Sequence, residues 1–230
     1  MRQDDDHEIT FYLQVFYDYG RAQWALSQLR RHYPTSRVIV ASDGDPNIRY
    51  TQWLNEFEIE LLYGRNLYRL TEGGGMLKRV LNLWGCDSNY LVTIDTDTCV
   101  HRRFRSLPDA QAVVMFGDCQ PIQGGCKGFT KNAGRKILHS GILDDPILSD
   151  PVKSFAMQAD GKLNRVVADT AIQQQRIVED WMWSWVCRQL EIPCLQHPEI
   201  YSRWRQRVPE GLDVAISHPH KEIPLDRTEL

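Results

Sequence analysis

Short apolar segments alternate with helical ones along the first half of the chain, and this alternation limits the fold more than any other feature of the sequence. Apolar, β-branched and aromatic residues predict strands within five segments, which are residues 9–17, 36–47, 57–64, 90–95 and 112–118. These strands are uniformly apolar, as strands are when helices cover both sides of a sheet. The sequence therefore predicts an α/β domain with a mostly parallel central sheet.

Helices are predicted between and after these strands, where apolar residues recur at helical spacing. One helix is predicted over residues 20–33, where Pro34 stops it, and another over residues 72–85. Further helices are predicted to begin near Lys131 and to span about residues 177–190. The remainder of the second half has no clear period.

Composition excludes several classes of protein. The 230 residues suffice for one domain, and the net charge of −3 argues against a nucleic-acid-binding surface, which is usually basic. No apolar run approaches the roughly 18 residues that a transmembrane segment needs, and the acidic N-terminus is no secretory signal. The six cysteines form no C-x-x-C pair or zinc spacing, so we interpret them as reduced thiols of a cytoplasmic protein.

Paired carboxylates follow the fourth predicted strand. The segment YLVTIDTDTCV (90–100) is apolar and then places Asp95 and Asp97 two positions apart. Converging carboxylates repel each other unless a positive charge lies between them, and Mg²⁺ or Mn²⁺ prefers such oxygen ligands. The segment therefore indicates a metal site, and the alternative is a capped turn with solvated carboxylates.

A second acidic turn follows the second predicted strand, where VIVASDGDPN (38–47) carries Asp43 and Asp45. Ligands of open α/β sheets bind beyond the carboxyl ends of the strands, where all four aspartates are predicted to lie. Asp43 is a candidate for binding a ligand; the alternative is a turn former before Gly44.

Strand ends of this kind resemble those of nucleotide-sugar-dependent glycosyltransferases of the GT-A fold, of the family-two type. In that family an early strand ends in a D-D-G-S-like turn that holds the nucleoside, and a later strand ends in a metal-binding D-x-D. IVASDGD (39–45) is similar to the first motif, although Ser42 and Asp45 depart from it. The resemblance implies that Asp43 contacts the base or ribose.

The resemblance covers about residues 9–221 and implies a GT-A (Rossmann-like) three-layer sandwich formed by one domain, residues 1–230. Within that domain it implies a nucleotide-sugar-binding half over about 9–118 and an acceptor and catalytic half over about 119–221. Residues 222–230 would be a tail.

RIVEDWMWSWVCRQL (176–190) carries Glu179 and Asp180 where a helix is predicted to begin. The pair looks like the E-D pair of many inverting members, in which one carboxylate deprotonates the acceptor hydroxyl. The resemblance assigns the base to Asp180, with Glu179 beside it; the alternative is helix N-terminal charge favoured by the macrodipole. Trp183 is expected either to stack on an acceptor sugar or to belong to the core.

AISHPHKE (215–222) matches the H-P-x-K-like string with which many members bring a histidine back to the metal. The resemblance implies that His218 is the third metal ligand, with His220 as the second candidate for this role. An isolated exposed histidine is the alternative.

Two further predictions concern contacts with the donor. Gly124 and Gly125 allow close approach of backbone to a ligand, and the family often has a glycine-containing loop there, bordering donor sugar and acceptor. Lys78 follows three glycines at 73–75, and it would either approach the diphosphate or lie on the exposed face of its helix.

The resemblance implies a glycosyltransferase dependent on Mn²⁺ or Mg²⁺. It would move a sugar, with inversion, from a nucleoside-diphosphate sugar (UDP favoured, GDP also compatible) to a hydroxyl of a saccharide, lipid-linked or small-molecule acceptor. Asp97 would be the direct metal ligand, whereas Asp95 would contact the ribose or act through water. The expected location is the cytoplasm, which is compatible with peripheral association with a membrane.

Two other functions remain open at this point. A haloacid-dehalogenase-like phosphatase also uses a D-x-D, with the first Asp as nucleophile, and LDDP (143–146) is the downstream acidic pair that would serve it. The second alternative is a nucleotide-sugar-binding protein without turnover.

Overall fold

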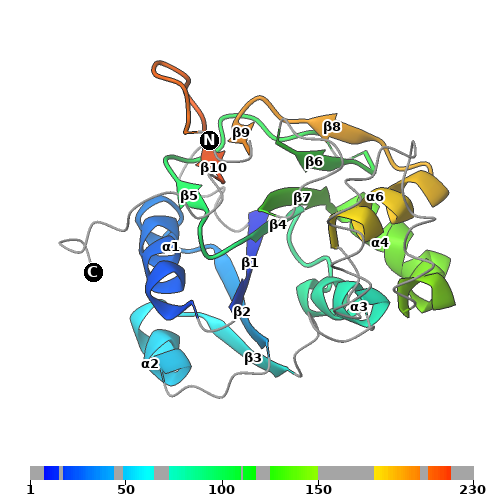
Figure 1. Cartoon of the computed structure of the whole chain (residues 1–230), viewed down its shortest axis with the longest axis horizontal. Coiled ribbons are helices and arrows are strands. Elements are labelled where there is room, and N and C mark those ends of the chain that lie inside the picture. Colours follow the sequence, from blue (N-terminus) through cyan, green and yellow to red (C-terminus); the bar gives the residue numbers. More distant parts are fainter. Residues whose placement is uncertain are drawn as a thin grey trace, which may run out of the picture.

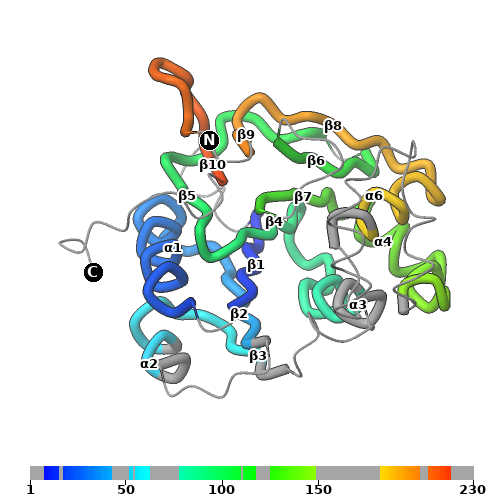
Figure 2. The backbone as a smooth tube through the Cα atoms, viewed as in Figure 1, coloured from blue at the N-terminus to red at the C-terminus, as the bar shows by residue number. Residues whose placement is uncertain are grey.

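A computed structural model describes residues 8–15, 18–43, 49–64, 73–109, 111–117, 125–149, 179–202 and 207–218, and Figure 2 draws the others in grey. Within these ranges only the backbone is described for residues 43, 49–51, 54, 63–64, 73–77, 149 and 179–181. The predicted halves and tail of the domain remain predictions.

A seven-stranded, mostly parallel sheet forms the centre of the structure, as predicted. Its strands follow the order β3-β2-β1-β4-β7-β6-β8, and only β7 runs against its neighbours. The strands are β1 (Ile9–Val15), β2 (Arg37–Asp43), β3 (Glu60–Gly64), β4 (Tyr90–Ile94), β6 (Val114–Phe116), β7 (Cys126–Thr130) and β8 (Cys194–Gln196).

Helices cover both faces of this sheet (Figure 1). On one face lie α1 (Tyr19–His32) and α2 (Arg49–Glu56). On the other lie α3 (Gly73–Trp84), α4 (Lys131–Ser140) and α6 (Glu179–Gln189), with the short 3₁₀ turns η2 (Ile142–Asp144) and η3 (Pro146–Ser149) after α4. The layers are helix, sheet and helix.

Alternate residues of the central strands enter two separate cores. Phe11 and Leu13 of β1 pack with the α1 and α2 side chains, whereas Tyr12 packs with those of α3, α4 and α6. Both faces of the strand are therefore buried, which explains why the strand carries no polar alternation.

A small second sheet joins distant parts of the chain. It contains β5 (Cys99–Val100), β10 (Ile216–Ser217) and β9 (Ile200–Tyr201), with β10 in the middle. The β10 strand pairs antiparallel with β5, so residues 216–217 lie beside the segment that follows β4 (Figure 2).

The elements that sequence periodicity did not predict are α2, β7, β8 and the small sheet. Residues 125–130 are not simply a loop before the predicted helix, because β7 occupies 126–130. CKGFT has no apolar alternation, yet Lys127 is fully buried within β7. Gly128 leaves room for Met115, whose methyl carbon lies 2.0 Å from where a Cβ would stand. Packing against β6 therefore overrides the weak strand propensity of this segment.

Trp183 belongs to the core, the second of the two places expected for it, and does not offer a surface for a sugar. Its side chain is only 1% exposed, and its ring lies 4.4 Å from that of Phe129. Cys187 is buried in the same core as Met182 and Val186. A helix buried over most of its surface does not have a single apolar stripe.

None of the helices in the described ranges is both long and apolar enough to cross a bilayer. The five cysteines within those ranges are free thiols, and Cys194 alone among them is exposed. Cys119 lies outside the described residues, and the cytoplasmic location remains a prediction.

Glu199 ties the segment after β5 to the small sheet. Its carboxylate accepts hydrogen bonds from the Arg102 guanidinium, from the backbone N–H groups of Arg105 and Ser106 and from the Ser106 hydroxyl. Burial raises the pKa of Glu199, but these donors outweigh that effect and hold the pKa below its ordinary value.

Glu199→Gln should lower the free energy of unfolding by about 2–3 kcal/mol at pH 7, because an amide places N–H groups against these donors. The carboxylate stabilises the fold above the ordinary pKa of 4.5, and this contribution is lost as the pH falls through the lower folded pKa. The difference between variant and wild type in urea denaturation should therefore shrink below about pH 4.5. Glu210→Gln, at an exposed loop position, is the control; equal effects of the two substitutions would contradict this role.

Candidate metal centre

A tight turn after β4 presents the two aspartates. The Asp95 carbonyl accepts the N–H of Thr98 at 3.1 Å, which closes the turn over residues 95–98. The buried Thr98 hydroxyl accepts the Asp95 N–H at 3.0 Å and donates to the Gly125 carbonyl at 2.7 Å. The turn is therefore fixed both internally and to the start of β7.

The same turn contacts the carboxyl end of β1. Thr96 donates from its hydroxyl to a carboxylate oxygen of Asp18 at 3.1 Å. Asp18 precedes α1, and β1 and β4 are parallel neighbours, so their carboxyl ends lie side by side. Asp18 was not predicted as part of the site, although its place just after the first strand was a usable signal.

His218 reaches this turn from the other end of the chain. It follows β10 directly, and its N–H donates to the Tyr201 carbonyl at 2.8 Å. Its Nε2 lies 3.0 Å from Oδ1 of Asp97 and 3.6 Å from Oδ2 of Asp95. The His218 and Asp97 side chains are 5% and 9% exposed, whereas that of Asp95 is 49% exposed.

These three side chains could hold one cation, because one ligand atom from each lies within 4.8 Å of the others. Adjacent ligands of an octahedral ion, at about 2.1 Å from the metal, are about 3.0 Å apart. The distance from Asp97 to His218 meets that value, and Asp95 stands slightly farther out. Two carboxylates and an imidazole form a donor set that fits a divalent cation. The sequence prediction of these three residues as neighbours is confirmed.

Thiols beside the cluster remain protonated. Burial raises the pKa of Cys99 to about 12, and burial likewise raises that of Cys126 to about 12. His101 contacts Ser217, the residue before His218, at 2.7 Å from Nε2 to Oγ, and burial followed by the charges of His32 and Arg102 lowers its pKa. The negative charge around the candidate ligands therefore comes from carboxylates.

Gly125 makes room for the histidine. A Cβ on this residue would lie 1.7 Å from Nδ1 of His218 and 1.9 Å from its Cγ. The sequence predicted that a ligand approaches the backbone here, and among the described residues the close neighbour is the chain's own imidazole. Gly124 lies outside the described residues.

The other predicted residues are placed as follows. Asp43 ends β2, and Glu179 and Asp180 begin α6, but the side chains of all three lie outside the description. Asp45 and His220 lie outside it entirely.

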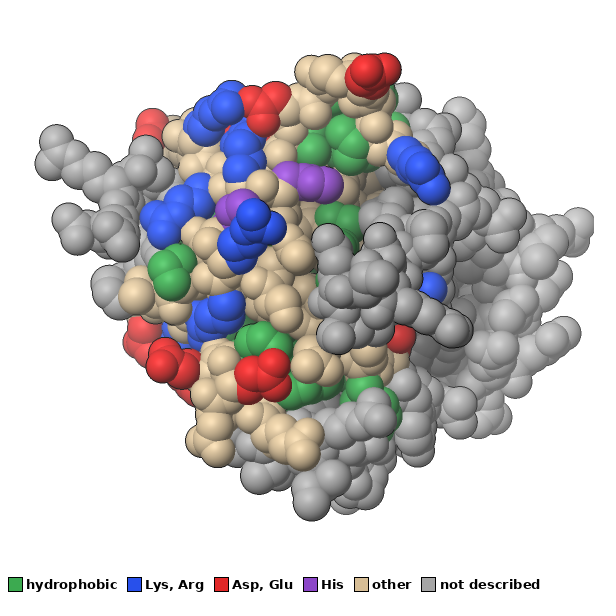
Figure 3. Space-filling view, turned by 90° about the vertical axis from the view of Figure 1, so that its left-hand side faces the viewer, with side chains coloured by type: hydrophobic (Ala, Val, Ile, Leu, Met, Phe, Trp, Pro, Cys, Tyr) green, Lys and Arg blue, Asp and Glu red, His purple; other side chains and the backbone are tan. Residues whose placement is uncertain are grey.

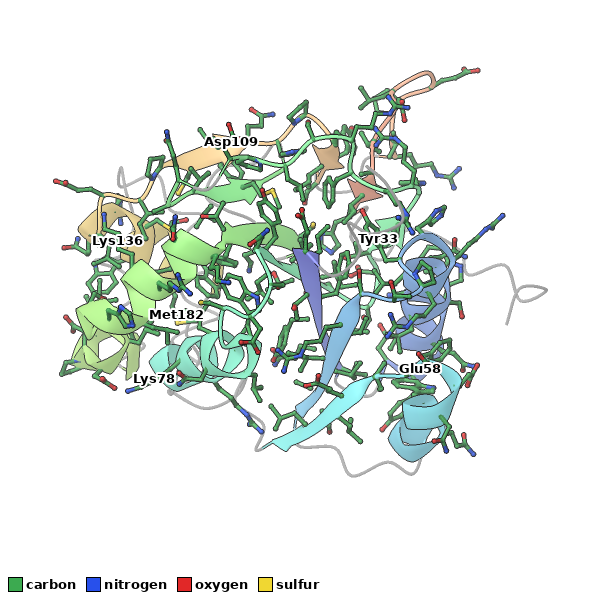
Figure 4. The ribbon with its side chains drawn as sticks, turned by 180° about the vertical axis from the view of Figure 1, so that it is seen from behind. Tyr33, Glu58, Lys78, Asp109, Lys136 and Met182 are labelled. Carbon is green, nitrogen blue, oxygen red and sulfur yellow. The ribbon has the colours of Figure 1, made fainter. Side chains whose placement is uncertain are left out.

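Lys78 lies on α3, with its Nζ 2.7 and 2.9 Å from the two carboxylate oxygens of Asp144 in η2. Figure 4 shows it on the opposite side of the sheet from Tyr33, which follows α1. Its side chain is 46% exposed, which agrees with an exposed helix face.

The acidic pair available to a phosphatase makes other contacts. Asp144 pairs with Lys78, and Asp145 accepts the N–H of Ile147 at 2.9 Å. Within the described ranges neither belongs to the cluster of Asp95, Asp97 and His218.

Gly125→Ala should displace His218, because backbone and imidazole cannot both keep their positions. We expect a loss of about 1–3 kcal/mol in stability from overpacking and a loss of Mn²⁺ affinity of at least about tenfold. Isothermal titration with Mn²⁺ would measure the affinity. Gly141→Ala is the control for alanine substitution, since no atom lies within 4 Å of its would-be Cβ, although its φ of +73° adds strain. Unchanged Mn²⁺ affinity in Gly125→Ala would contradict the placement of His218 against Gly125.

Comparison with models of known protein families found no match, and comparison with curated proteins also found none. The site is therefore interpreted from its own geometry.

Proposed function

We propose that this protein is a metal-dependent glycosyltransferase of GT-A type that uses a nucleoside-diphosphate sugar. The observation that carries this proposal is the meeting of Asp95, Asp97 and His218 at the carboxyl end of β4. The strand order β3-β2-β1-β4 supports it, because β1 continues to β2 on one side while β4 lies on the other. Open α/β sheets bind ligands where the order reverses in this way.

Asp97 and His218 would hold the cation, and Mn²⁺ suits a set that mixes carboxylates with an imidazole, with Mg²⁺ the alternative. The bound cation would supply Lewis acidity that offsets the charge of the departing diphosphate. Asp95 is half exposed, which leaves it accessible to the ribose or to a bridging water. Asp97 and His218 are buried and hydrogen bonded, so they keep their positions without the donor.

Asp180 would accept the proton of the acceptor hydroxyl. That hydroxyl would attack the anomeric carbon from the side opposite the diphosphate, which would invert the configuration of this carbon. This role rests on the resemblance of Glu179-Asp180 to the family's E-D pair and on the place of both residues at the start of α6.

Two alternatives remain to be separated by experiment. The contacts of Asp144 and Asp145 weigh against a phosphatase, since they hold the acidic pair that would serve it in other positions. A binding protein without turnover would keep the metal site and lack transfer.

UDP together with Mn²⁺ should raise the melting temperature of the wild-type protein by roughly 5–10 °C at about a hundred times the Kd. The same melting-temperature measurement with GDP, CDP and ADP, each with and without Mn²⁺, identifies the nucleotide base that the protein prefers. Asp97→Asn should abolish the shift because it removes a metal ligand, whereas Asp109→Asn, at an exposed position, should retain it. A shift without metal, or one that survives in Asp97→Asn, would contradict the site; hydrolysis of a generic phosphomonoester with Mg²⁺ would instead indicate the phosphatase.

Asp180→Asn should reduce the transfer rate by about 10²–10⁴-fold and leave diphosphate affinity within about twofold, because a base acts on the acceptor and not on the donor. Glu179→Gln is the matched control, with a smaller effect. Release of UDP from a UDP-sugar in the presence of acceptor measures the rate. Turnover at the wild-type level in Asp180→Asn would refute this assignment, and loss in Glu179→Gln alone would move the base to Glu179.

A further inference from the structure

Two cysteines meet where α6 ends and β8 begins. Cys187, in the last turn of α6, is 1% exposed and belongs to the core, whereas Cys194, the first residue of β8, is exposed. A side-chain hydrogen bond joins the two thiols. The pair therefore combines one buried thiol with one that solvent reaches.

The turn after α6 brings the two cysteines together. The Ile192 N–H donates to the Cys187 carbonyl at 2.8 Å. The Glu191 N–H donates to the Arg188 carbonyl at 3.1 Å, and Glu191 itself has a φ of +50°. These features form the Schellman motif, in which the chain leaves a helix and turns back beside it. Glycine is usual at the left-handed position, so the turn is kept here despite the strain of a glutamate.

The edge of the central sheet holds the second cysteine. Cys194 pairs with Val114 of β6, and the Val114 N–H donates to the Pro193 carbonyl at 3.0 Å. The Cys194 thiol also donates to the Ile192 carbonyl at 3.6 Å. Both ends of the connecting segment, residues 188–193, are therefore anchored with the two thiols side by side.

The exposed thiol is the more reactive of the two. The hydrogen bond with Cys187 lowers the pKa of Cys194, although burial opposes this, and the same hydrogen bond together with burial raises the pKa of Cys187. Lys and Arg side chains gather on the face that Figure 3 shows, on the side of α1, whereas α6 and β8 lie on the opposite side of the molecule in Figure 1. The buried thiol, and not that basic face, therefore favours the Cys194 thiolate, which is the nucleophilic form.

We propose that Cys187 and Cys194 form a modification site, which a small disulfide such as oxidised glutathione converts reversibly into a protein disulfide. The Cys194 thiolate attacks one sulfur of the small disulfide, whose S–S bond breaks and releases one thiolate. The Cys187 thiol, as it loses its proton, attacks Cys194 in the mixed disulfide and releases the second small thiolate. The protein loses two electrons and two protons, and the small disulfide gains them as two thiols.

The new bond would secure the edge of the sheet. β8 has three residues, all exposed, and among the described strands it pairs with β6 alone. A cross-link to Cys187 would connect this short strand to the core in which α6 is buried. Because a cross-link limits the freedom of the unfolded chain, the oxidised protein should melt roughly 3–8 °C above the reduced protein.

Mass spectrometry of the whole protein after incubation with oxidised glutathione tests the site. Arg188 separates the two cysteines, so trypsin produces one peptide that contains Cys187 and another that contains Cys194. The disulfide should join these two peptides with a loss of about 2 Da, and dithiothreitol should separate them again. The other described cysteines are buried, so they are internal controls and should remain unmodified.

The amount of coloured thiol released from dithiobis(nitrobenzoate) distinguishes a coupled pair from two independent thiols. In a coupled pair, Cys187→Ala should lower the release by about one equivalent per chain and Cys194→Ala by about two, because the buried thiol reacts only with the mixed disulfide. If the thiols are independent, Cys187→Ala should change nothing and Cys194→Ala should remove about one equivalent. That second result would overturn the proposal.

Three further results would also overturn it. They are the absence of the linked peptide at every ratio of oxidised to reduced glutathione, a bond from Cys194 to a different cysteine, and an oxidised protein that melts below the reduced one. A melting temperature within about 2 °C of the wild type shows that a variant is folded. Where Cys187→Ala does not fold, the linked peptide in the wild type and its absence in Cys194→Ala decide.

Discussion

The antiparallel pairing of β10 with β5 is the constraint on which the candidate site depends. β5 begins two residues after Asp97, and β10 ends one residue before His218. Their register, with Ser217 opposite Cys99, places the histidine over the D-x-D turn. The two strands contribute little area themselves, and their place is secured by Glu199 and Arg102 on one side and by the buried Thr98 on the other.

Sequence reasoning predicted the central part of the fold because local patterns determine it. Segments such as β1 and β4 are mostly apolar at successive positions, which is typical of a strand that is covered on both faces. The α1 and α3 helices were predicted because apolar residues recur in them at helical spacing. What the sequence did not reveal depends on contacts between distant residues, as in β7, whose Lys127 and Gly128 are poor strand formers stabilised by burial against other strands.

The residues of the candidate site that could bind a cation were predictable from the sequence. The residues that hold the turn in place were not. The candidate ligands are easy to recognise in the sequence, because two carboxylates follow an apolar strand and a histidine precedes a proline. Asp95, Asp97 and His218 do lie together in the structure. Thr98 holds the turn through hydrogen bonds with Asp95 and Gly125, and nothing in its local sequence indicates that role. Asp18 accepts a hydrogen bond from Thr96 of the turn, and its place after the first strand is its one sequence signal. The sequence left two places open for Trp183, because helical spacing identifies one buried face and gives no sign that α6 is covered over most of its surface.

Asp97 and His218 are 121 positions apart in the chain, and this separation has a consequence for biosynthesis. A ribosome delivers the D-x-D turn long before the histidine, so the growing chain carries two close carboxylates without their nitrogen partner. Contacts so distant in sequence form late, because loop closure must precede them. The three candidate ligands can therefore meet only after residue 218 has been synthesised, so the candidate site is completed late in folding.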